Sequence, residues 1–244
     1  MEAVATAHRV GPVIATLGGR FMLDEATTAG GAEIGLSFPE FYMLGRGSVL
    51  GDVDADVVAA TFVYFPVPIV RMMWESARAK HAPDAIVEPY IEACRKFGRT
   101  HFATAPNLDE LCALAERVIN EASPIGAPLF AGWRAVALPD DAPGRLAQML
   151  HVLRELRGGS HAIAVLSSDL SPLEAIIGSG ETGTAQAQLF GWSEPYPDPA
   201  ATASVRAEAE ELTDRLAAPA FEVLTPDERV RLAELLNEVS AAAT

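Results

Sequence analysis

Three basic side chains stand close together in residues 153–166, LRELRGGSHAIAVL. Arg154, Arg157 and His161 fall within eight positions of a chain whose formal net charge is −15. A guanidinium group can hold a carboxylate or phosphate through paired hydrogen bonds, and an imidazole can exchange a proton near neutral pH. The stretch is therefore compatible with a helix end, an anion-binding site or an acid–base catalytic group.

The elements that must position these side chains explain part of the pattern. Residues 142–159 have an apolar face at helical spacing and end on a glycine pair, a common helix stop, so that Arg154 and Arg157 would lie in the last turn. Cations there stabilise the helix dipole by about 0.3–1 kcal/mol each. His161 would then begin a new helix, whose positive end disfavours an imidazolium. We therefore expect His161 to be neutral or paired with an anion.

His161 is also the candidate catalytic residue of the chain. Glu174, in the segment that follows, could orient the His161 imidazole for acid–base catalysis. The arginines nearby would stabilise negative charge that develops on a substrate. A purely structural role for His161, as a hydrogen-bonded core residue, remains an alternative.

Arg46 is the second candidate anion ligand, because it stands between glycines in MLGRGS. Together with Arg157, and with Arg154 nearby, it could hold a carboxylate or phosphate. The alternative is a structural ion pair between Arg46 and a carboxylate at the next helix start, either Asp52 or Asp54.

Aromatic residues cluster in the same part of the sequence. They could line an apolar pocket that encloses a small organic ligand, although the same residues at helical spacing also suit an ordinary core. The expected ligand-binding members are Tyr42, Phe62 and Phe65, accompanied by Phe38, Phe41 and Tyr64.

Length and composition indicate a globular protein. The 244 residues, half of them apolar, are enough for one large core or two modest ones. No stretch approaches the roughly 18 apolar residues of a membrane span, and the first residues lack a secretory signal pattern, so we expect a cytoplasmic protein and no membrane partner. Cys94 and Cys112 lack metal-ligand spacing, and we expect neither a metal nor a cofactor.

The charge balance argues against a nucleic-acid partner. The chain has 18 Lys and Arg residues against 33 Asp and Glu residues, and its basic residues form only short islands. Affinity for nucleic acid comes largely from cations that neutralise phosphates. The acidic balance therefore predicts that the protein does not bind nucleic acid.

Apolar residues recur at spacings of three and four along nearly the whole chain, which predicts an all-α fold. A helix capped by Asp54 should be followed by a second over residues 69–80, with Met72 and Met73 facing inward. We expect two helical domains, residues 1–138 with the ligand pocket and residues 139–244.

The C-terminal part contains one expected long connection and two expected helices. Residues 178–204 are rich in Gly and then in Pro, which is typical of a connection or a lid. Two acidic helices broken at Pro219 follow, the second capped by Thr225 with Glu228 three residues later. Such a helical pair is typical of packing or of a homodimer interface.

The whole chain resembles a group of largely uncharacterised actinobacterial proteins whose C-terminal half is a degenerate winged helix of the MarR type. The resemblance implies an Arg-Gly-Asp-Gly-His string where this chain has Arg157-Gly-Gly-Ser-His161, and a histidine near Ile14 that is missing here. The stretches that carry the resemblance are residues 41–70, 153–166, 173–175 (LEA), 189–192 (LFGW) and 213–224.

The resemblance is weakest where a winged helix would contact DNA. After Trp192 the chain is proline-rich and acidic, and residues 181–205 contain no Lys or Arg, where a recognition helix and a basic wing should follow. We therefore interpret the chain as a former regulator that has kept a ligand cavity but lost its DNA contact.

These observations lead to one main prediction and two alternatives. The main prediction is an interdomain cavity that binds a small, mainly apolar organic ligand with an acidic or carbonyl group, in a cofactor-independent enzyme of specialised metabolism. The alternatives are a MarR-like, ligand-responsive transcription regulator that dimerises through its C-terminal helices, and a non-catalytic interaction protein.

Overall fold

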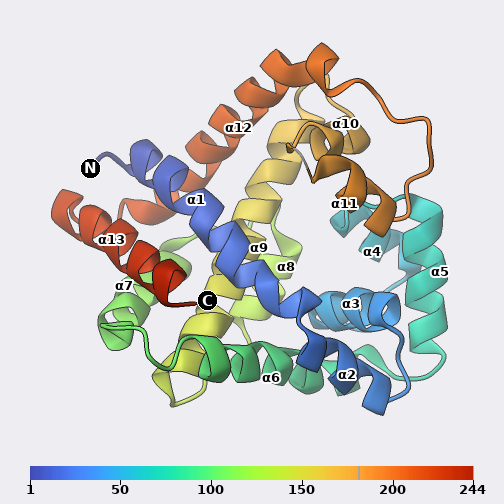
Figure 1. Ribbon diagram of the computed structural model, residues 1–244, viewed down its shortest axis with the longest axis horizontal. Helices are drawn as coiled ribbons and strands as arrows, with labels where there is room; N and C mark the ends of the chain where they lie inside the picture. Colours follow the sequence, from blue (N-terminus) through green and yellow to red (C-terminus); the bar gives the residue numbers. More distant parts are fainter. Residues whose placement is uncertain (181, 244) are drawn as a thin grey trace.

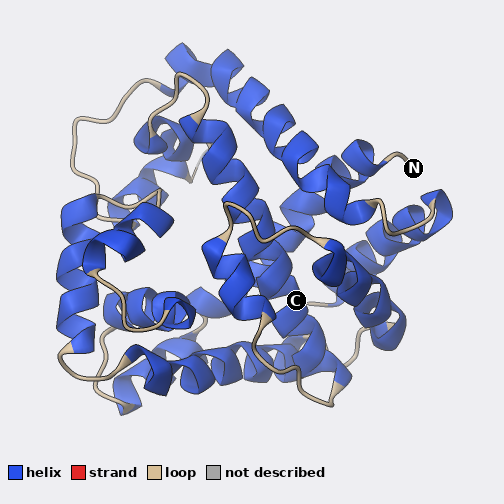
Figure 2. Ribbon diagram, turned by 180° about the vertical axis from the view of Figure 1, so that it is seen from behind, coloured by secondary structure: helices blue, strands red, loops and turns tan. Residues whose placement is uncertain are grey.

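The computed structural model describes residues 1–180 and 182–243. In this part of the chain all regular secondary structure is helical, with 13 α-helices, four short 3₁₀ helices and no β-strand (Figure 2). The predicted all-α fold is confirmed. No helix among these residues is both long enough and apolar enough to cross a membrane.

The helices in the first half of the chain include α1 (Ala3–Arg20), which runs from the upper left to the centre of Figure 1, and others that build the lower and right-hand parts of the molecule. The others are η1 (Phe21–Leu23), α2 (Glu25–Glu33), α3 (Phe38–Gly47), η2 (Ser48–Leu50), α4 (Ala55–Thr61), α5 (Val67–Arg78), α6 (Pro83–His101), α7 (Leu108–Glu121) and α8 (Pro128–Arg134). The second half consists of α9 (Ala142–Leu166), α10 (Pro172–Ile177), α11 (Gly183–Leu189), η3 (Pro199–Thr202), α12 (Ala203–Ala217), η4 (Ala218–Phe221) and α13 (Pro226–Ala242).

The long helix α9 is the centre of the fold (Figure 1). Five helices pack against it, namely α1, α6, α7, α8 and α12. Because neighbours surround α9, apolar residues on several of its faces are buried, among them Leu146, Ala147, Leu150 and Val152. Polar side chains that α9 carries must therefore find partners inside the protein.

Helix α9 continues through Gly158 and Gly159 instead of ending there, so the expected helix stop is wrong. A Cβ at Gly159 would lie 2.7 Å from the Cβ of Ala127, and the missing side chain serves close packing. Arg154 and Arg157 therefore lie within the helix, and the dipole at a helix end does not explain them.

One main hydrophobic core contains residues from Ala3 to Ala243 and so includes both sides of residue 138. Helix α1 packs against α9, α12 and α13, which all belong to the expected second domain. The division at residue 138 stays a prediction. Helix α13 belongs to the C-terminal pair expected to serve packing or a homodimer, and its apolar residues Leu232, Leu235, Leu236 and Val239 are buried within the chain.

Two short helix–turn–helix pairs relate differently to this core: the α4–α5 pair contributes Val58 and Trp74 to it, whereas the α10–α11 pair has its own small cluster. In the α4–α5 pair, Asp54 caps α4 as expected, accepting a hydrogen bond from the Asp56 backbone N–H at 2.9 Å. Trp74 is fully buried on α5 whereas Met72 is 50% exposed, so the expected inward direction of Met72 is wrong.

The α10–α11 pair has the same number of residues between its helices as the α4–α5 pair, namely five. Glu181 among them lies outside the described residues. Helix α11 thus occupies part of the expected connection.

Candidate functional site

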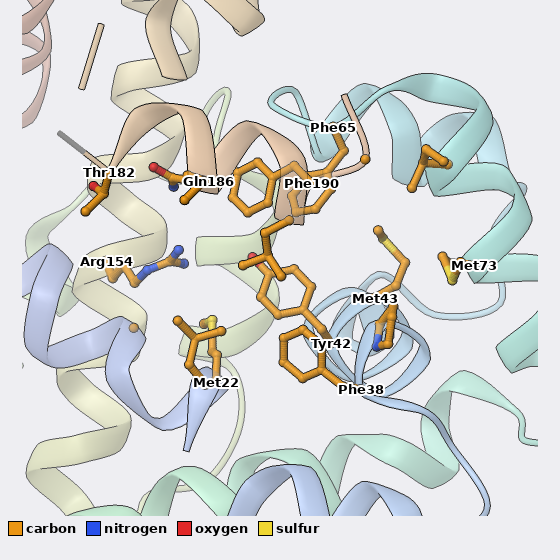
Figure 3. Close-up of a pocket in the computed structure, with 17 residues that line it drawn as sticks. Met22, Phe38, Tyr42, Met43, Phe65, Met73, Arg154, Thr182, Gln186 and Phe190 are labelled. Carbon is orange, nitrogen blue, oxygen red and sulfur yellow. The ribbon is translucent and has the colours of Figure 1, made fainter. Parts of the chain in front are cut away.

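An apolar pocket of about 500 Å³ opens between α3, α5, α9 and α11 (Figure 3). This volume lies within the range of pockets that hold small organic molecules. We call this space the apolar pocket; its main side chains are Met22, Leu23, Phe38, Tyr42, Met43, Phe65, Ile69, Met73, Leu189 and Phe190, with Arg154, Thr182 and Gln186 as polar members.

Local sequence features build two walls of the apolar pocket. Phe38 and Tyr42 are four residues apart on α3 and therefore lie on the same side of that helix. Phe65, in the turn before α5, stacks on Phe190 at a ring distance of 4.1 Å. The chain then turns at Gly191, whose φ of 90° and closeness to Ile69 leave no room for a side chain.

A second pocket of about 230 Å³, here called the arginine pocket, adjoins the first. Four arginines and one histidine line it: Arg46, Arg154, Arg157, Arg206 and His161. Five residues line both pockets, so the two are neighbours that share a wall; they are Tyr42, Phe65, Arg154, Gln186 and Phe190. Figure 3 shows the Arg154 side chain reaching from α9 into this space.

Arg46 is held by Glu155 of α9. Its Nε and Nη2 atoms donate to the two Glu155 carboxylate oxygens at 2.9 and 2.8 Å, and Arg154 donates to the same carboxylate at 2.8 Å. Burial alone would raise the Glu155 pKa, but the two arginines lower it to about 2. The alternative pairing of Arg46 with Asp52 or Asp54 is wrong, because Asp52 pairs with Arg78 and Asp54 caps α4.

A second carboxylate, Glu210 of α12, holds the other two arginines. It accepts hydrogen bonds from Arg157 at 2.7 Å and from Arg206 at 3.2 Å. The His161 Nε2 atom lies 3.9 Å from the same carboxylate. Each of the two carboxylates, Glu155 and Glu210, is therefore shared by two arginines.

The hydrogen bonds of His161 define its neutral form. Thr213 donates its hydroxyl proton to the Ala209 carbonyl at 2.7 Å, so it accepts from His161 Nδ1 at 2.9 Å. A neutral His161 then carries its proton on Nδ1 and leaves Nε2 as an acceptor. Burial lowers the His161 pKa while Glu210 opposes this shift, and the result is a pKa below the usual value. Burial, and not the positive end of a helix dipole, therefore favours the neutral form of His161.

The structure does not bring Glu174 to His161. The Glu174 carboxylate accepts hydrogen bonds from the Ser171 backbone N–H and hydroxyl at 2.8 and 2.7 Å, which caps α10. The expected orientation of His161 by Glu174 is therefore corrected, because Thr213 and Glu210 take that position.

The expected aromatic residues divide between the pocket and the core. Tyr42 and Phe65 line the apolar pocket, whereas Phe62 is buried under the guanidinium of Arg46, 4.6 Å from the ring centre. Tyr64, named among the aromatic residues that could line a ligand pocket, lines the arginine pocket and stacks on His161 at 5.7 Å. Its hydroxyl is buried and has no hydrogen-bond partner among the described residues.

Sequence reasoning missed three residues of this site: Glu155, Glu210 and Arg206. A signal exists for Glu155, because it is a carboxylate between arginines in an otherwise apolar helix. No such signal separates Glu210 from Glu208 and Glu211 in the same acidic run. In the described part of the chain, no cluster of three or more His, Cys, Asp or Glu residues could hold a metal ion.

The model of a helix-turn-helix family matches residues 7–244. The chain belongs to this helix-turn-helix family. No curated protein and no solved structure matches it significantly. Because helix-turn-helix proteins characteristically bind DNA, the expectation that the acidic balance excludes a nucleic-acid partner is wrong. Net charge describes the whole surface, whereas DNA contact depends on a local one.

Proposed function

We propose that this helix-turn-helix protein is a DNA-binding regulator that responds to a small, mainly apolar ligand with an acidic or carbonyl group. One observation carries the proposal: the apolar pocket lies between the two helix–turn–helix pairs. Ile69 and Met73 of α5 line one side, and Gln186 and Leu189 of α11 line another (Figure 3). A ligand that contacts both pairs can favour one arrangement of them and so change DNA affinity.

We assign the DNA-reading role to α5. It has 12 residues, against seven in α11, and it carries Arg71 and Arg78, while α11 has no basic residue. Arg71 pairs with Asp56 and Arg78 with Asp52 near the surface. Such exposed pairs contribute only about 0–1 kcal/mol, so DNA phosphates can replace the carboxylates.

The remaining charges predict how this DNA binding should behave. Twelve of the 18 Lys and Arg side chains in the described part pair with carboxylates. Few cations are therefore free to contact phosphates, and we expect binding that is measurable at low salt and falls as salt rises.

The DNA arm of the test selects duplexes from a randomised library at low salt and measures binding by fluorescence polarisation. The double variant Arg71→Gln/Arg78→Gln should weaken binding and reduce the slope of log affinity against log salt by about 2. Arg99→Gln/Arg231→Gln removes the same charge from exposed pairs on α6 and α13 and serves as the control. Selection of no duplex, or equal loss in both double variants, would refute the assignment.

The ligand arm uses the uncharged fluorescent probe N-phenylnaphthylamine. Met73→Trp should fill the apolar pocket and abolish probe binding, while Met72→Trp, the same change at an exposed neighbouring position, should leave it unchanged. Probe binding should also change the DNA affinity of the wild-type protein. A DNA affinity that is the same with and without bound probe would contradict ligand response.

A second candidate function is acid–base chemistry on a bound metabolite, and His161 favours it. Its Nε2 atom is an acceptor in the neutral form, and four arginines beside it would stabilise negative charge. His161→Gln should abolish conversion of a co-purifying ligand, followed by mass spectrometry. A ligand that the wild-type protein binds and releases unchanged would exclude this candidate.

A further inference from the structure

We propose that the ligand is an amphipathic organic anion, with its charged group in the arginine pocket and its apolar body in the apolar pocket. This inference rests on the proposed ligand-binding function and makes it more specific, because it chooses an anion over a neutral carbonyl compound. The inference depends on the charges, the free hydrogen-bond donors and the five residues that line both pockets.

The arginine pocket carries an excess of positive charge. Four arginines line it, and no Asp or Glu is among its described lining residues. Glu155 and Glu210 do not line the pocket. Each carboxylate is shared by two of the four arginines and can neutralise the charge of only one of them, which leaves two positive charges uncompensated. Asp214, the next acidic group near His161, hydrogen-bonds to His8 at 2.8 Å and does not line the pocket. The chain as a whole has a net charge of −15, so the positive charge of this pocket distinguishes it from the rest of the protein.

The arginines also keep free donors. An arginine has five N–H donors, yet Arg154 and Arg157 each donate one hydrogen bond to described residues and Arg206 donates two. Their side chains are 21–26% exposed, so they are only partly hydrated. The buried Tyr64 hydroxyl is a further donor at this pocket that has no partner among the described residues. Anionic oxygens would satisfy these groups.

The apolar pocket determines the rest of the ligand. Flexible methionines and aromatic rings, such as Met22, Met43 and Phe38, surround the space next to Arg154 (Figure 3). Methionine side chains adapt to apolar groups of varied shape. A molecule that reaches from the arginines into this space must have one charged end and one apolar end.

A matched pair of probes tests this inference. Anilinonaphthalene sulfonate and N-phenylnaphthylamine have the same aromatic body and differ by one sulfonate. We expect the sulfonate to bind at least about tenfold more tightly, as one added charged contact would give, and only its affinity should fall with salt. Arg206→Gln should lower the affinity for the sulfonate about tenfold and leave the neutral probe unchanged.

Arg215→Gln is the matched control, because it removes the same charge from α12 at a position that pairs only with exposed Glu211. Circular dichroism and thermal melting check that each variant folds. If Arg206→Gln fails to fold, Tyr64→Phe provides the test, with Tyr196→Phe as a hydroxyl deletion outside the pocket. Tyr64→Phe should lower the affinity for the sulfonate probe and leave the affinity for the neutral probe unchanged.

The outcomes separate this inference from the proposed function. Equal affinities for the two probes would overturn the inference that the ligand is an anion, and so would an equal loss of sulfonate affinity in Arg206→Gln and Arg215→Gln. Either result would still leave an apolar ligand pocket. If Met73→Trp leaves the binding of both probes unchanged, the proposed ligand-binding role of the apolar pocket is wrong.

Discussion

At the scale of single residues, His151 lies in the middle of α9 with a fully buried side chain. Neither ring nitrogen has a hydrogen-bond partner among the described residues, and the rings of Phe21, Tyr90 and Trp133 lie 5.0–6.1 Å away. Burial lowers the His151 pKa to about 3, although Glu155 opposes the shift. This histidine is therefore neutral in the folded protein at neutral pH.

The lowered pKa predicts how stability depends on pH. Between the usual value of 6.5 and about 3, the unfolded chain binds a proton that the folded chain does not. The free energy of unfolding should therefore fall as pH decreases through this range, by up to about 1.4 kcal/mol per pH unit from His151. Urea unfolding at neutral pH and at about pH 5 measures the effect.

The variant His151→Phe isolates this contribution, because it keeps an aromatic ring and removes the titrating group. It should lose less stability on acidification than the wild-type protein. The effect of His161, whose pKa is also lowered, is present in both chains and cancels in the comparison. Parallel pH dependences in the two proteins would contradict the prediction.

At the scale of elements, local sequence signals located most helices but not their tertiary contacts. Asp54 caps α4, and Thr225 forms a capping box with Glu228 as expected, because these interactions involve neighbouring residues. The glycine pair in α9 misled the prediction, because its role is to let another segment approach the helix. The face that α5 buries is likewise set by the fit of Trp74, which periodicity does not measure.

The two glycines of α9 should respond in opposite ways to the same substitution. A Cβ at Gly158 meets nothing within 4 Å, so Gly158→Ala should stabilise the protein by about 0.5–1 kcal/mol through helix propensity. A Cβ at Gly159 lies 2.7 Å from Ala127, so Gly159→Ala should destabilise it. Urea unfolding compares the two, and a loss of stability in Gly158→Ala would count against an open space there.

At the scale of the whole molecule, the α10–α11 pair stands apart from the main core. Ile176, Ile177 and Ala187 form their own small cluster, which partly buried residues such as Phe190 and Trp192 extend. Trp192 ties the cluster to the α4–α5 pair, since its indole N–H donates to the Tyr64 carbonyl at 2.9 Å. Few buried apolar contacts imply a low free energy of local opening.

Amide hydrogen exchange should detect this local opening. Residues 183–189 should exchange faster than the centre of α9, and Trp192→Phe should accelerate their exchange further because it removes the hydrogen bond to Tyr64. Trp133→Phe is a contrasting variant in the main core, where the whole protein should lose stability. Equal exchange in α11 and α9 would rule out independent opening.

The whole molecule also explains why the site was only partly predictable. Arg154, Arg157 and His161 share one helix, so their proximity follows from the sequence alone. Arg46 meets Glu155, and Glu210 meets Arg157, only through tertiary packing, over sequence separations of 109 and 53 residues. The acidic balance gave a wrong prediction about nucleic acid, because it averages over a surface on which basic residues have local roles.

The ion pair between Arg46 of α3 and Glu155 of α9 cannot be reversed by exchanging these two residues alone. Glu155 serves Arg46 and Arg154 together, so an exchange that combines Arg46→Glu with Glu155→Arg would set two like charges side by side along α9. A reciprocal swap, which restores a simple ion pair, would fail to restore this one. Reversing the polarity of this ion pair therefore requires a change at Arg154 as well as at Arg46 and Glu155.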